Sequence, residues 1–375
     1  MIGSLPMSET PPPARTLSRT QAWVLILALV LLSLVWIAID WRNQALAERP
    51  RYELAALPST LQALAVIEDV TLDLPPVLGG DRVVFVGRLG AAEESALLAL
   101  DVMSGAQQWQ WDVRTLTVPN GWPETWPWSP PVAWRWSGLE VADGVVYAVN
   151  AYVLQTAVRA YDINSGQQQW LRHLGTLNGS DADTMLLTEN RIGIRISEGD
   201  FNAFYVLNQE NGYLLQQRRR DARYIFWVDE TPLRIYEASA DTINVSQFAS
   251  WQRRVGGCGL TPQLADTVLI VYAQGCDMAP NRVLALDRST GAVVWTYERG
   301  VVSNVAVNGR LTAFLSTTGQ LLLIDTATGQ DIAVLSFLHN ITNIPPDSKF
   351  FVAVQEDLLA VYFGDSHQLF LFRLV

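Results

Sequence analysis

Residues that could perform chemistry are few in this sequence and lie far apart. Its histidines, His173, His339 and His367, fall in different stretches of a repeated pattern, in or beside predicted outer strands or connecting loops. Because such positions point side chains away from a common centre, we expect neither a metal site nor a catalytic triad. The sequence also lacks the Gly-x-Ser-x-Gly, His-Glu-x-x-His and phosphate-binding loop motifs of common enzyme families. These observations argue against catalysis.

The two cysteines, Cys258 and Cys276, are 18 positions apart. They flank a predicted pair of antiparallel strands, so we expect both thiols at one end of one hairpin. A disulfide needs Cα atoms within about 7 Å of each other, which a hairpin end allows. If it forms, it indicates an oxidising compartment outside the cytoplasm. A buried, reduced pair is the alternative.

The net charge of the chain argues against nucleic acids as partners. The formal net charge is −11 at pH 7, and an acidic surface repels phosphate backbones, so we expect no nucleic-acid binding. The one basic cluster, RRRDAR at residues 218–223, follows a predicted outer strand. We expect its arginines to be solvated or paired with Asp229 and Glu230.

The elements that must position these residues are short strands. From about residue 70 onward, apolar runs of five or six residues, rich in β-branched and aromatic types, are bounded by Gly, Asp, Asn and Ser. Strands separated by turn signals every 8–12 residues are typical of an all-β domain.

One turn recurs five times along this domain. An Asp or Asn is followed four positions later by Gly, and in three copies a Trp stands four positions further on. The side-chain oxygen accepts backbone N–H groups, glycine supplies a positive φ, and Trp offers an apolar plate to a neighbouring unit. The residues of these turns are Asp101, Gly105 and Trp109; Asp162, Gly166 and Trp170; Asn208 and Gly212; Asp287, Gly291 and Trp295; and Asp325 and Gly329.

The spacing of these turns predicts the architecture. Successive turns are 38 or 46 residues apart, a 79-residue gap fits two units with a hidden copy near Ile243, and a 61-residue gap fits one unit plus an insertion. A degenerate copy is expected at Phe363. Seven units of about 40 residues predict an all-β propeller with seven four-stranded blades, with eight blades as the alternative. Residues 64–73 are expected to add an outer strand to the last blade or to belong to an incomplete eighth.

The repeated signature, Asp-x-x-Ser/Thr-Gly-x-x-x-Trp, resembles the PQQ-like (pyrroloquinoline-quinone-like) propeller repeat over about residues 70–375. That repeat occurs in quinoprotein alcohol dehydrogenases and in the propeller lipoprotein of the outer-membrane barrel-assembly machinery, and the resemblance implies the propeller fold. In the dehydrogenases an adjacent Cys-Cys pair, a Trp floor and a calcium site hold the cofactor. This chain has no adjacent cysteines and no Cys-x-x-Cys-His haem site, so we expect no cofactor.

The insertion, residues 117–136, reads TVPNGWPETWPWSPPVAWRW and holds five of the fourteen tryptophans. Proline restricts φ and removes a backbone donor, so this stretch is no ordinary strand pair. Either its rings pack inward over the first two blades, or they form a semi-rigid platform for a partner. In the second interpretation Trp122, Trp126 and Trp128 contact the partner, and the last two tryptophans pack against the second blade.

The N-terminal part differs from the rest, and we divide the chain into a polar tail (1–21), an apolar helix (22–41), a linker (42–63) and the propeller (64–375). The run AWVLILALVLLSLVWIAI carries no charge. At 1.5 Å per residue it is long enough for the ~30 Å core of a bilayer, so we expect a transmembrane signal-anchor. A cleaved signal peptide with its site at Ala-Leu-Ala, residues 45–47, is the alternative.

Together these features predict a non-catalytic, single-pass, membrane-tethered β-propeller with a cytoplasmic N-terminus and an extracytoplasmic propeller. It would act as a monomeric scaffold for an unidentified protein, peptide or glycan. The alternative is a propeller enzyme, either a degenerate quinoprotein or a hydrolase, which would need acidic or histidine side chains gathered at the axial channel.

Overall fold

The computed structural model describes the chain in several segments. These are residues 27–28, 30–37, 39, 51–112, 135–152, 155–174, 182–187, 190–198, 201–221, 224–230, 233–247, 250–277, 279–337 and 349–375. The chain separates into two compact units, Met1–Pro50 and Arg51–Val375.

The described residues of the first unit, 27–28, 30–37 and 39, are helical. Their apolar side chains are exposed, among them Leu31, Val35 and Trp36. No helix in the described part of the chain is long and apolar enough to cross a membrane. The predicted span at 22–41 lies partly outside the described residues.

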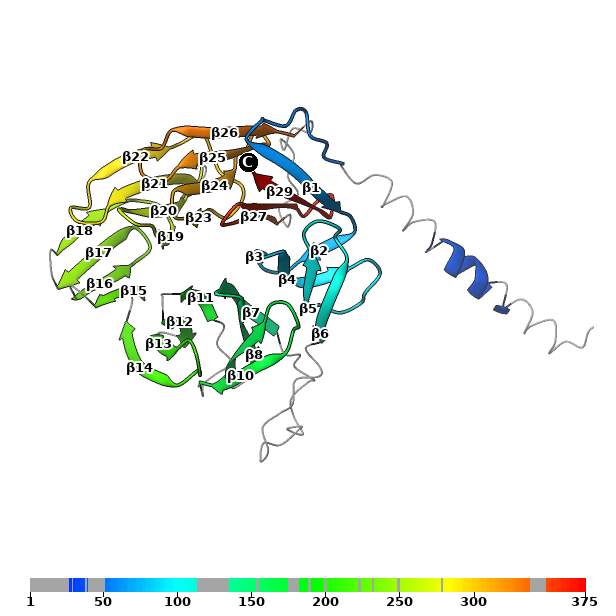
Figure 1. Cartoon of the computed structure of the whole chain (residues 1–375), viewed down its shortest axis with the longest axis horizontal. Coiled ribbons are helices and arrows are strands. Elements are labelled where there is room, and N and C mark those ends of the chain that lie inside the picture. Colours follow the sequence, from blue (N-terminus) through cyan, green and yellow to red (C-terminus); the bar gives the residue numbers. More distant parts are fainter. Residues whose placement is uncertain are drawn as a thin grey trace, which may run out of the picture. The chain divides into compact units, whose positions relative to one another are not determined.

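The second unit is a ring of seven antiparallel blades, six with four strands and blade 1 with a fifth, and the first strand of each blade lies near the axis (Figure 1). Blade 1 contains β3 (Val77–Gly79), β4 (Arg82–Leu89), β5 (Ala96–Asp101) and β6 (Gln107–Asp112), with β2 (Val70–Leu72) also paired to β4; blade 2 contains β7 (Arg135–Ala142), β8 (Val145–Tyr152), β9 (Gln155–Asp162) and β10 (Gln168–His173). Blade 3 contains β11 (Ala182–Leu187), β12 (Arg191–Glu198), β13 (Phe201–Asn208) and β14 (Leu214–Asp221); blade 4 contains β15 (Tyr224–Glu230), β16 (Leu233–Ala238), β17 (Thr242–Gln247) and β18 (Trp251–Arg254).

The remaining three blades complete the predicted seven-bladed, all-β propeller, which is therefore confirmed. Blade 5 contains β19 (Gly259–Leu264), β20 (Val268–Gln274), β21 (Arg282–Asp287) and β22 (Val293–Tyr297); blade 6 contains β23 (Ala306–Asn308), β24 (Leu311–Leu315), β25 (Gln320–Asp325) and β26 (Asp331–Ser336). Blade 7 contains β27 (Phe350–Gln355), β28 (Leu358–Phe363), β29 (Gln368–Leu374) and, as its outer strand, β1 (Leu61–Ile67). We call the four strands of a blade A to D from the axis outward.

The hydrophobic core is divided among the seams between blades. Strands B and C read as nearly continuous apolar runs, such as Val83–Val86 in β4, because both of their faces are covered by neighbouring blades. Alternate residues then enter different seams: Val84 packs toward blade 2, whereas Val83 and Phe85 pack toward blade 7. The seam between blades 3 and 4 has a cluster of only three described buried side chains, Phe204, Val206 and Ile235.

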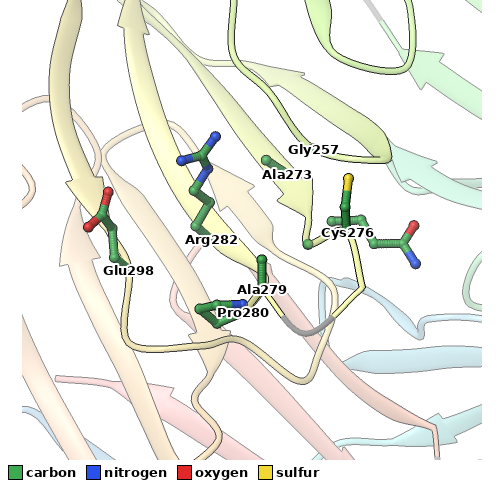
Figure 2. Close-up of a pocket in the computed structure, with 9 residues that line it drawn as sticks. Gly257, Ala273, Cys276, Ala279, Pro280, Arg282 and Glu298 are labelled. Carbon is green, nitrogen blue, oxygen red and sulfur yellow. The ribbon is translucent and has the colours of Figure 1, made fainter.

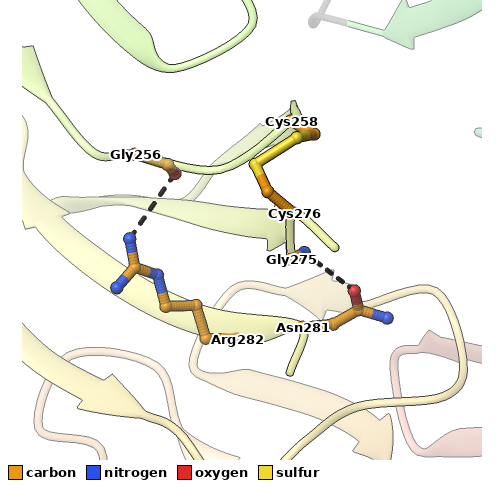
Figure 3. Close-up of a disulfide and its surroundings, with 6 residues drawn as sticks. All are labelled: Gly256, Cys258, Gly275, Cys276, Asn281 and Arg282. Carbon is orange, nitrogen blue, oxygen red and sulfur yellow. Dashed lines mark hydrogen bonds between the residues drawn. A yellow bond between two sulfur atoms is a disulfide. The ribbon is translucent and has the colours of Figure 1, made fainter. Parts of the chain in front are cut away.

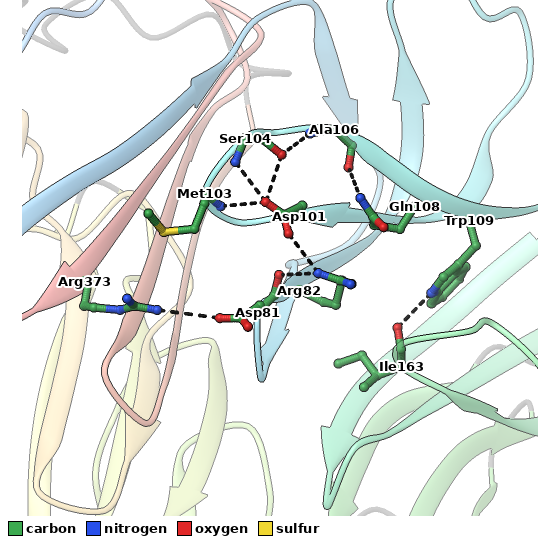
Figure 4. Close-up of polar contacts among 10 residues, drawn as sticks. All are labelled: Asp81, Arg82, Asp101, Met103, Ser104, Ala106, Gln108, Trp109, Ile163 and Arg373. Atoms are coloured by element: carbon green, nitrogen blue, oxygen red, sulfur yellow. Dashed lines mark hydrogen bonds and ion pairs between the residues drawn. The ribbon is translucent and has the colours of Figure 1, made fainter.

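The ring is closed by the N-terminal strand of the propeller. β1 pairs antiparallel with β29 from Leu61 opposite Leu374 to Ile67 opposite Leu369. This agrees with the expectation that the segment before blade 1 supplies an outer strand to the last blade. An ion pair of 3.7 Å between Arg373 and Asp81 also links blade 7 to blade 1 (Figure 4).

Four tryptophans on D strands dock onto the next blade. Each indole Nε1 donates to the carbonyl of the residue that follows the Asp or Asn of the neighbouring C–D turn. The pairs are Trp109 to Ile163 (2.8 Å; Figure 4), Trp170 to Gln209 (3.2 Å), Trp251 to Arg288 (3.0 Å) and Trp295 to Thr326 (2.9 Å). Each ring covers the turn glycine so closely that a Cβ on Gly166, Gly212, Gly291 or Gly329 would lie within 2.5–2.7 Å of a ring atom.

The seam between blades 6 and 7 is filled differently, by the chain that precedes β1. Tyr52 is 2% exposed, stacks on Phe363 at 4.1 Å, and donates from its hydroxyl to Asp365 at 2.6 Å. Leu54 forms a β-bridge with Phe337. The compact unit thus begins at Arg51, and the part of the predicted linker (42–63) from residue 51 onward belongs to the propeller, because an aromatic side chain anchors it.

Two further expectations are corrected. Phe363, expected to mark a degenerate C–D turn, ends β28, the B strand of blade 7. The segment between blades 6 and 7 is longer than the one between blades 5 and 6, so counting 38 residues stops one strand early. The basic cluster at 218–223 was expected to follow an outer strand, but residues 218–220 lie within β14, the D strand of blade 3.

Candidate binding face

The loops of a propeller separate onto two faces. The D–A and B–C connections meet on one face, which we call the B–C face, whereas the A–B turns and the short C–D turns lie on the opposite face. The C–D turns are regular and closed by their own hydrogen bonds. In the first of them, Asp101 Oδ1 accepts from the Ser104 amide (3.0 Å) and hydroxyl (2.8 Å; Figure 4). Asp101 O accepts from the Gly105 amide at 2.8 Å.

These turn aspartates are held in the charged form by their own loops. Hydrogen bonds from Ser104 lower the pKa of Asp101, those from Ser165 lower that of Asp162, and those from Thr290 and Thr328 lower those of Asp287 and Asp325. In the third copy the neutral Asn208 accepts the same backbone bonds, from Glu210 at 3.0 Å and Asn211 at 3.1 Å. A turn that works equally with Asp and Asn has a structural role, since no negative charge is required.

The B–C face carries a groove that runs across blades 5, 6 and 7. Three adjoining cavities of about 410, 330 and 300 Å³ form it. The first two share Ala279 and Pro280 as walls, and the last two share Val302 and Phe350. We call this continuous depression the blade 5–7 groove.

The end of the groove on blade 5 is pinned by the disulfide (Figures 2 and 3). Cys258 and Cys276 are bonded, with Cα atoms 5.2 Å apart, and Cys276 itself lines the 410 Å³ cavity. Cys258 precedes β19 and Cys276 follows β20, so the predicted pairing across one hairpin end is confirmed.

Hydrogen bonds reinforce the same loops (Figure 3). Arg282 Nη2 donates to the carbonyl oxygens of Val255 and Gly256, which lie just before Cys258. Asn281 Oδ1 accepts from the Gly275 amide at 2.9 Å. A Cβ on Gly275 would lie 1.8 Å from the carbonyl oxygen of Ala279, so only glycine permits this closure. The disulfide, these hydrogen bonds and the close approach at Gly275 thus constrain this wall of the groove.

Side-chain amides join the inner strands beneath the groove. Asn304 caps the free edge of β27, donating from Nδ2 to Val352 O (2.9 Å) and accepting at Oδ1 from Val352 N (2.8 Å). Gln263 donates to Val305 O at 2.7 Å, which links blade 5 to blade 6 in the same way. These pairs occupy backbone groups that strand A would otherwise leave unpaired.

The lining of the groove is mainly apolar and aromatic, with scattered charges. Tyr272, Phe350 and Phe351 are in its 300 Å³ part, together with Lys349, the single lysine of the chain. At the other end, in the 410 Å³ part, Arg282 on β21 and Glu298, directly after the neighbouring β22, lie side by side (Figure 2). Burial raises the pKa of Tyr272, and its hydrogen bond with Asn281 opposes this only in part, so the phenol stays neutral. Such a surface suits a neutral or mixed-charge chain molecule.

The structure does not bring the histidines together. His173 ends β10 in blade 2, whereas His367 lies in the B–C turn of blade 7, where its Nδ1 pairs with Thr71 Oγ1 at 3.0 Å. His339 lies outside the described residues. Within the described segments, no group of three or more His, Cys, Asp or Glu side chains is placed to hold a metal ion.

The predicted contact residues Trp122, Trp126 and Trp128 lie outside the described residues. The segment that contains them leaves β6 and enters β7, and therefore starts and ends on the B–C face, the face of the groove. Trp136, on β7, is 6% exposed and packs in the seam between blades 1 and 2, as expected for the last tryptophan of the insertion.

Sequence reasoning missed the residues that shape the groove. Asn304 lies in an irregular stretch before the very short β23, and Arg282 opens an ordinary C strand. Neither stands in a motif. Gly256 and Gly257, directly before Cys258, were the available signal for a tight loop, and both have positive φ, 78° and 121°.

Comparison with known proteins gives a partial match. Residues 248–344, about a quarter of the chain, match the family described as outer membrane protein assembly factor BamB. The predicted resemblance to the PQQ-like repeat of the assembly-machinery propeller is thereby confirmed for this stretch, which covers most of the groove. No curated protein matches the chain.

Two solved structures are similar at low identity. The crystal structure of BamB from Moraxella catarrhalis is 15% identical, covering 84% of this chain and 98% of that one, with a TM-score of 0.43. The computationally designed Ika8 protein is 12% identical, covering 84% of this chain and 100% of that one, with a TM-score of 0.48.

Proposed function

We propose that this protein is a non-catalytic scaffold that binds an extended segment of another protein in the blade 5–7 groove. One observation carries the proposal: three adjoining cavities form one elongated depression on the irregular face of the ring, with a disulfide at its blade 5 end. Small-molecule sites are usually closed pockets with convergent polar groups, whereas peptide grooves are long and lined by apolar and aromatic side chains.

Several features support a protein ligand. The walls are pre-organised by the disulfide and by Arg282, so little ordering is needed on binding. The matching family is described as an assembly factor, a role that fits a scaffold better than an enzyme. Trp122, Trp126 and Trp128, on the segment that leaves the same face, stay predicted additional contacts.

We further propose that residues 22–41 anchor the propeller in a membrane, with the propeller outside the cytoplasm. The exposed apolar side chains of the helical residues 30–37 support the anchor. A disulfide with one half exposed, at Cys258, supports an oxidising compartment.

Matched photo-crosslinking positions test the binding face. Thr317 lines the groove on blade 6, and Ala327 lies on the C–D turn of the same blade, and both are exposed. A benzophenone amino acid at Thr317 should yield crosslinks that map to one segment of one protein, and the same group at Ala327 should not. Equal crosslinking from the two positions would refute the groove as the binding site.

The anchor is tested separately. The variant Leu31→Arg, Val35→Arg should shift the chain from the carbonate-resistant membrane fraction into the supernatant, because each charge is costly within a bilayer. Glu53→Arg, on the exposed surface of the second unit, should leave the fractionation unchanged. If the double variant stays with the membrane, the proposed anchor is wrong.

A further inference from the structure

An arginine is buried in the seam between blades 1 and 2. Arg159 lies on β9, the C strand of blade 2, and is 3% exposed. On this strand Val158 and Ala160 pack toward blade 3, whereas Tyr161 packs toward blade 1. Side chains alternate along a strand, so Arg159 shares the face of Tyr161 and points toward blade 1.

The contacts of Arg159 are all with neutral groups. Nε donates to Asn150 Oδ1 at 3.4 Å and Nη1 donates to Gln168 Oε1 at 2.7 Å. Tyr161 is the neighbour that favours the charged form of the Arg159 guanidinium. The Tyr161 phenol stays protonated because burial raises the pKa of Tyr161 to about 12. Nη2 makes no hydrogen bond, and no carboxylate of the described residues pairs with the guanidinium.

Further buried donors lie on the same face. Asn150 stands directly opposite Trp136 across the sheet, and neither Asn150 Nδ2 nor Trp136 Nε1 has a hydrogen-bond partner. Asn150 is 0% exposed and Trp136 is 6% exposed. Because Asn150 Oδ1 already accepts from Arg159, its free end is a donor. Three buried N–H groups on this face thus have no hydrogen-bond partner, and the Tyr161 hydroxyl on the same face and His173 Nδ1 on the same blade have none either.

Among the described residues, the surroundings supply no carboxylate that pairs with Arg159. The facing wall of blade 1 includes Leu97 and Trp111, which are apolar or, at the indole N–H, already bonded to Gly166 O. His173 lies in register with Asn150 across the sheet, with Ala157 on the strand between them. Burial, Arg159 and Arg172 lower the pKa of His173. Its ring is therefore neutral near pH 7, and Arg159 is the buried charge among the described residues of this seam.

A buried cation without an anion is strongly unfavourable, and unpaired buried donors add to the cost. A carboxylate is planar, negatively charged and accepts on two oxygens, which matches a guanidinium edge and adjacent N–H donors. We infer that the seam between blades 1 and 2 is a carboxylate-binding site built by Arg159, Asn150 and Trp136.

The site lies close to the B–C face. Trp136 is the second residue of β7, Asn150 is two residues from the end of β8, and Arg159 is four residues from the start of β9. At about 3.3 Å per residue the donors are roughly 3–13 Å below that face. A small free acid or a glutamate side chain of a bound polypeptide both present the required group within this depth.

The experiment uses the full chain in detergent and follows both thermal melting and saturation-transfer NMR of the ligand. Sodium formate should raise the melting temperature saturably relative to sodium chloride at equal ionic strength, and its NMR signal should report binding. Arg159→Met should weaken formate binding by about 10- to 100-fold, the effect of losing charge-assisted hydrogen bonds. Arg253→Met, at an exposed position on β18, is the matched control and should bind formate like the wild type.

A capped Ala-Glu-Ala tripeptide and its Gln counterpart distinguish the two sources of the carboxylate. Binding of formate and of the Glu peptide, but not of the Gln peptide, assigns the site to an acidic side chain. Binding of formate alone assigns it to a small free acid. If wild-type protein binds neither, or if Arg159→Met folds and binds formate unchanged, the site does not exist. Should Arg159→Met fail to fold, Arg159→Lys serves instead, since it keeps the charge and loses the planar fork.

Discussion

At the scale of residues, the propeller repeats one contact: an indole of one blade covers the turn glycine of the next. Gly329 illustrates it, with φ of 72° and a ring atom of Trp295 2.5 Å from where a Cβ would lie. Glycine is required twice, once for the left-handed backbone and once for the absence of a side chain. The indole N–H then satisfies Thr326 O, which lies in the same turn.

The first prediction compares two glycine substitutions. Gly329→Ala should lower the free energy of unfolding by about 2–4 kcal/mol, because it adds backbone strain and displaces Trp295. Gly309→Ala is the control, since it also has positive φ (52°) but nothing lies within 4 Å of its Cβ position. It should cost only about 1 kcal/mol. Urea unfolding at neutral pH measures both, and equal losses would show that the indole contact contributes nothing.

The second prediction concerns pH. Hydrogen bonds from Ser or Thr lower the folded-state pKa values of Asp101, Asp162, Asp287 and Asp325. The stability that comes from a lowered pKa is present above the unfolded value of about 4 and is lost as the pH falls through the folded value. Replacing all four with Asn, as nature does at position 208, should therefore flatten the fall in melting temperature below pH 4. If the melting temperature of the quadruple variant falls below pH 4 as steeply as that of the wild type, these turns do not control the loss of stability in acid.

At the scale of elements, the seven seams are unequal. The seam of blades 5 and 6 has a docking tryptophan and a buried cluster that includes Phe314 and Ile324. The seam of blades 3 and 4 has no docking tryptophan among its described residues, because β14 carries none and the C–D turn of blade 4 lacks the Asp and Gly of the other copies.

The third prediction follows from this inequality. Under native conditions with a little denaturant, hydrogen exchange should be faster in β13 and β16 than in β21 and β24, since a seam without a docking indole has fewer contacts to break when it opens. Peptide-level mass spectrometry resolves the two regions, and the strands compared are all B or C strands. Uniform protection around the ring would contradict an early-opening seam between blades 3 and 4.

At the scale of the whole molecule, closure depends on the N-terminal strand. β1 covers the outer edge of β29, and Tyr52 fills the seam of blades 6 and 7 against Phe363. An open ring would expose both the backbone edge of β29 and the aromatic side chains Phe370 and Phe372, which are 3% and 1% exposed in the closed ring. Exposed edges of this kind lead to aggregation.

The fourth prediction tests closure by truncation. A chain that begins at Arg51 retains the compact unit and should melt cooperatively and at the same temperature as the full chain. A chain that begins at Asp69 lacks β1 and Tyr52, and should melt at a markedly lower temperature and scatter light at micromolar concentration. Adding a peptide of residues 51–68 should restore part of the loss. Identical melts for the two truncated chains would show that the ring closes without β1.

Residues close together in the sequence determine part of this architecture. The turn residues, from Asp101 to Gly329, determine C–D hairpins because Asx hydrogen bonds and a positive-φ glycine act over five residues. Their spacing then determines the blade number. Cys258 and Cys276 pair predictably for the same reason, since one hairpin brings them together.

The remaining features depend on residues that are distant in sequence, and only the tertiary structure decides them. Tyr52 lies in the last seam through contacts with Phe363 and Asp365, about 310 positions away. Asn304 meets Val352 from another blade, and the burial of Arg159 depends on the wall that blade 1 presents. Phe363 was misassigned because the longer connection after blade 6 breaks the period. A fixed residue spacing cannot show which strand a residue occupies when a connecting segment changes length. Hydrogen-bond pairing and burial in the tertiary structure decide it.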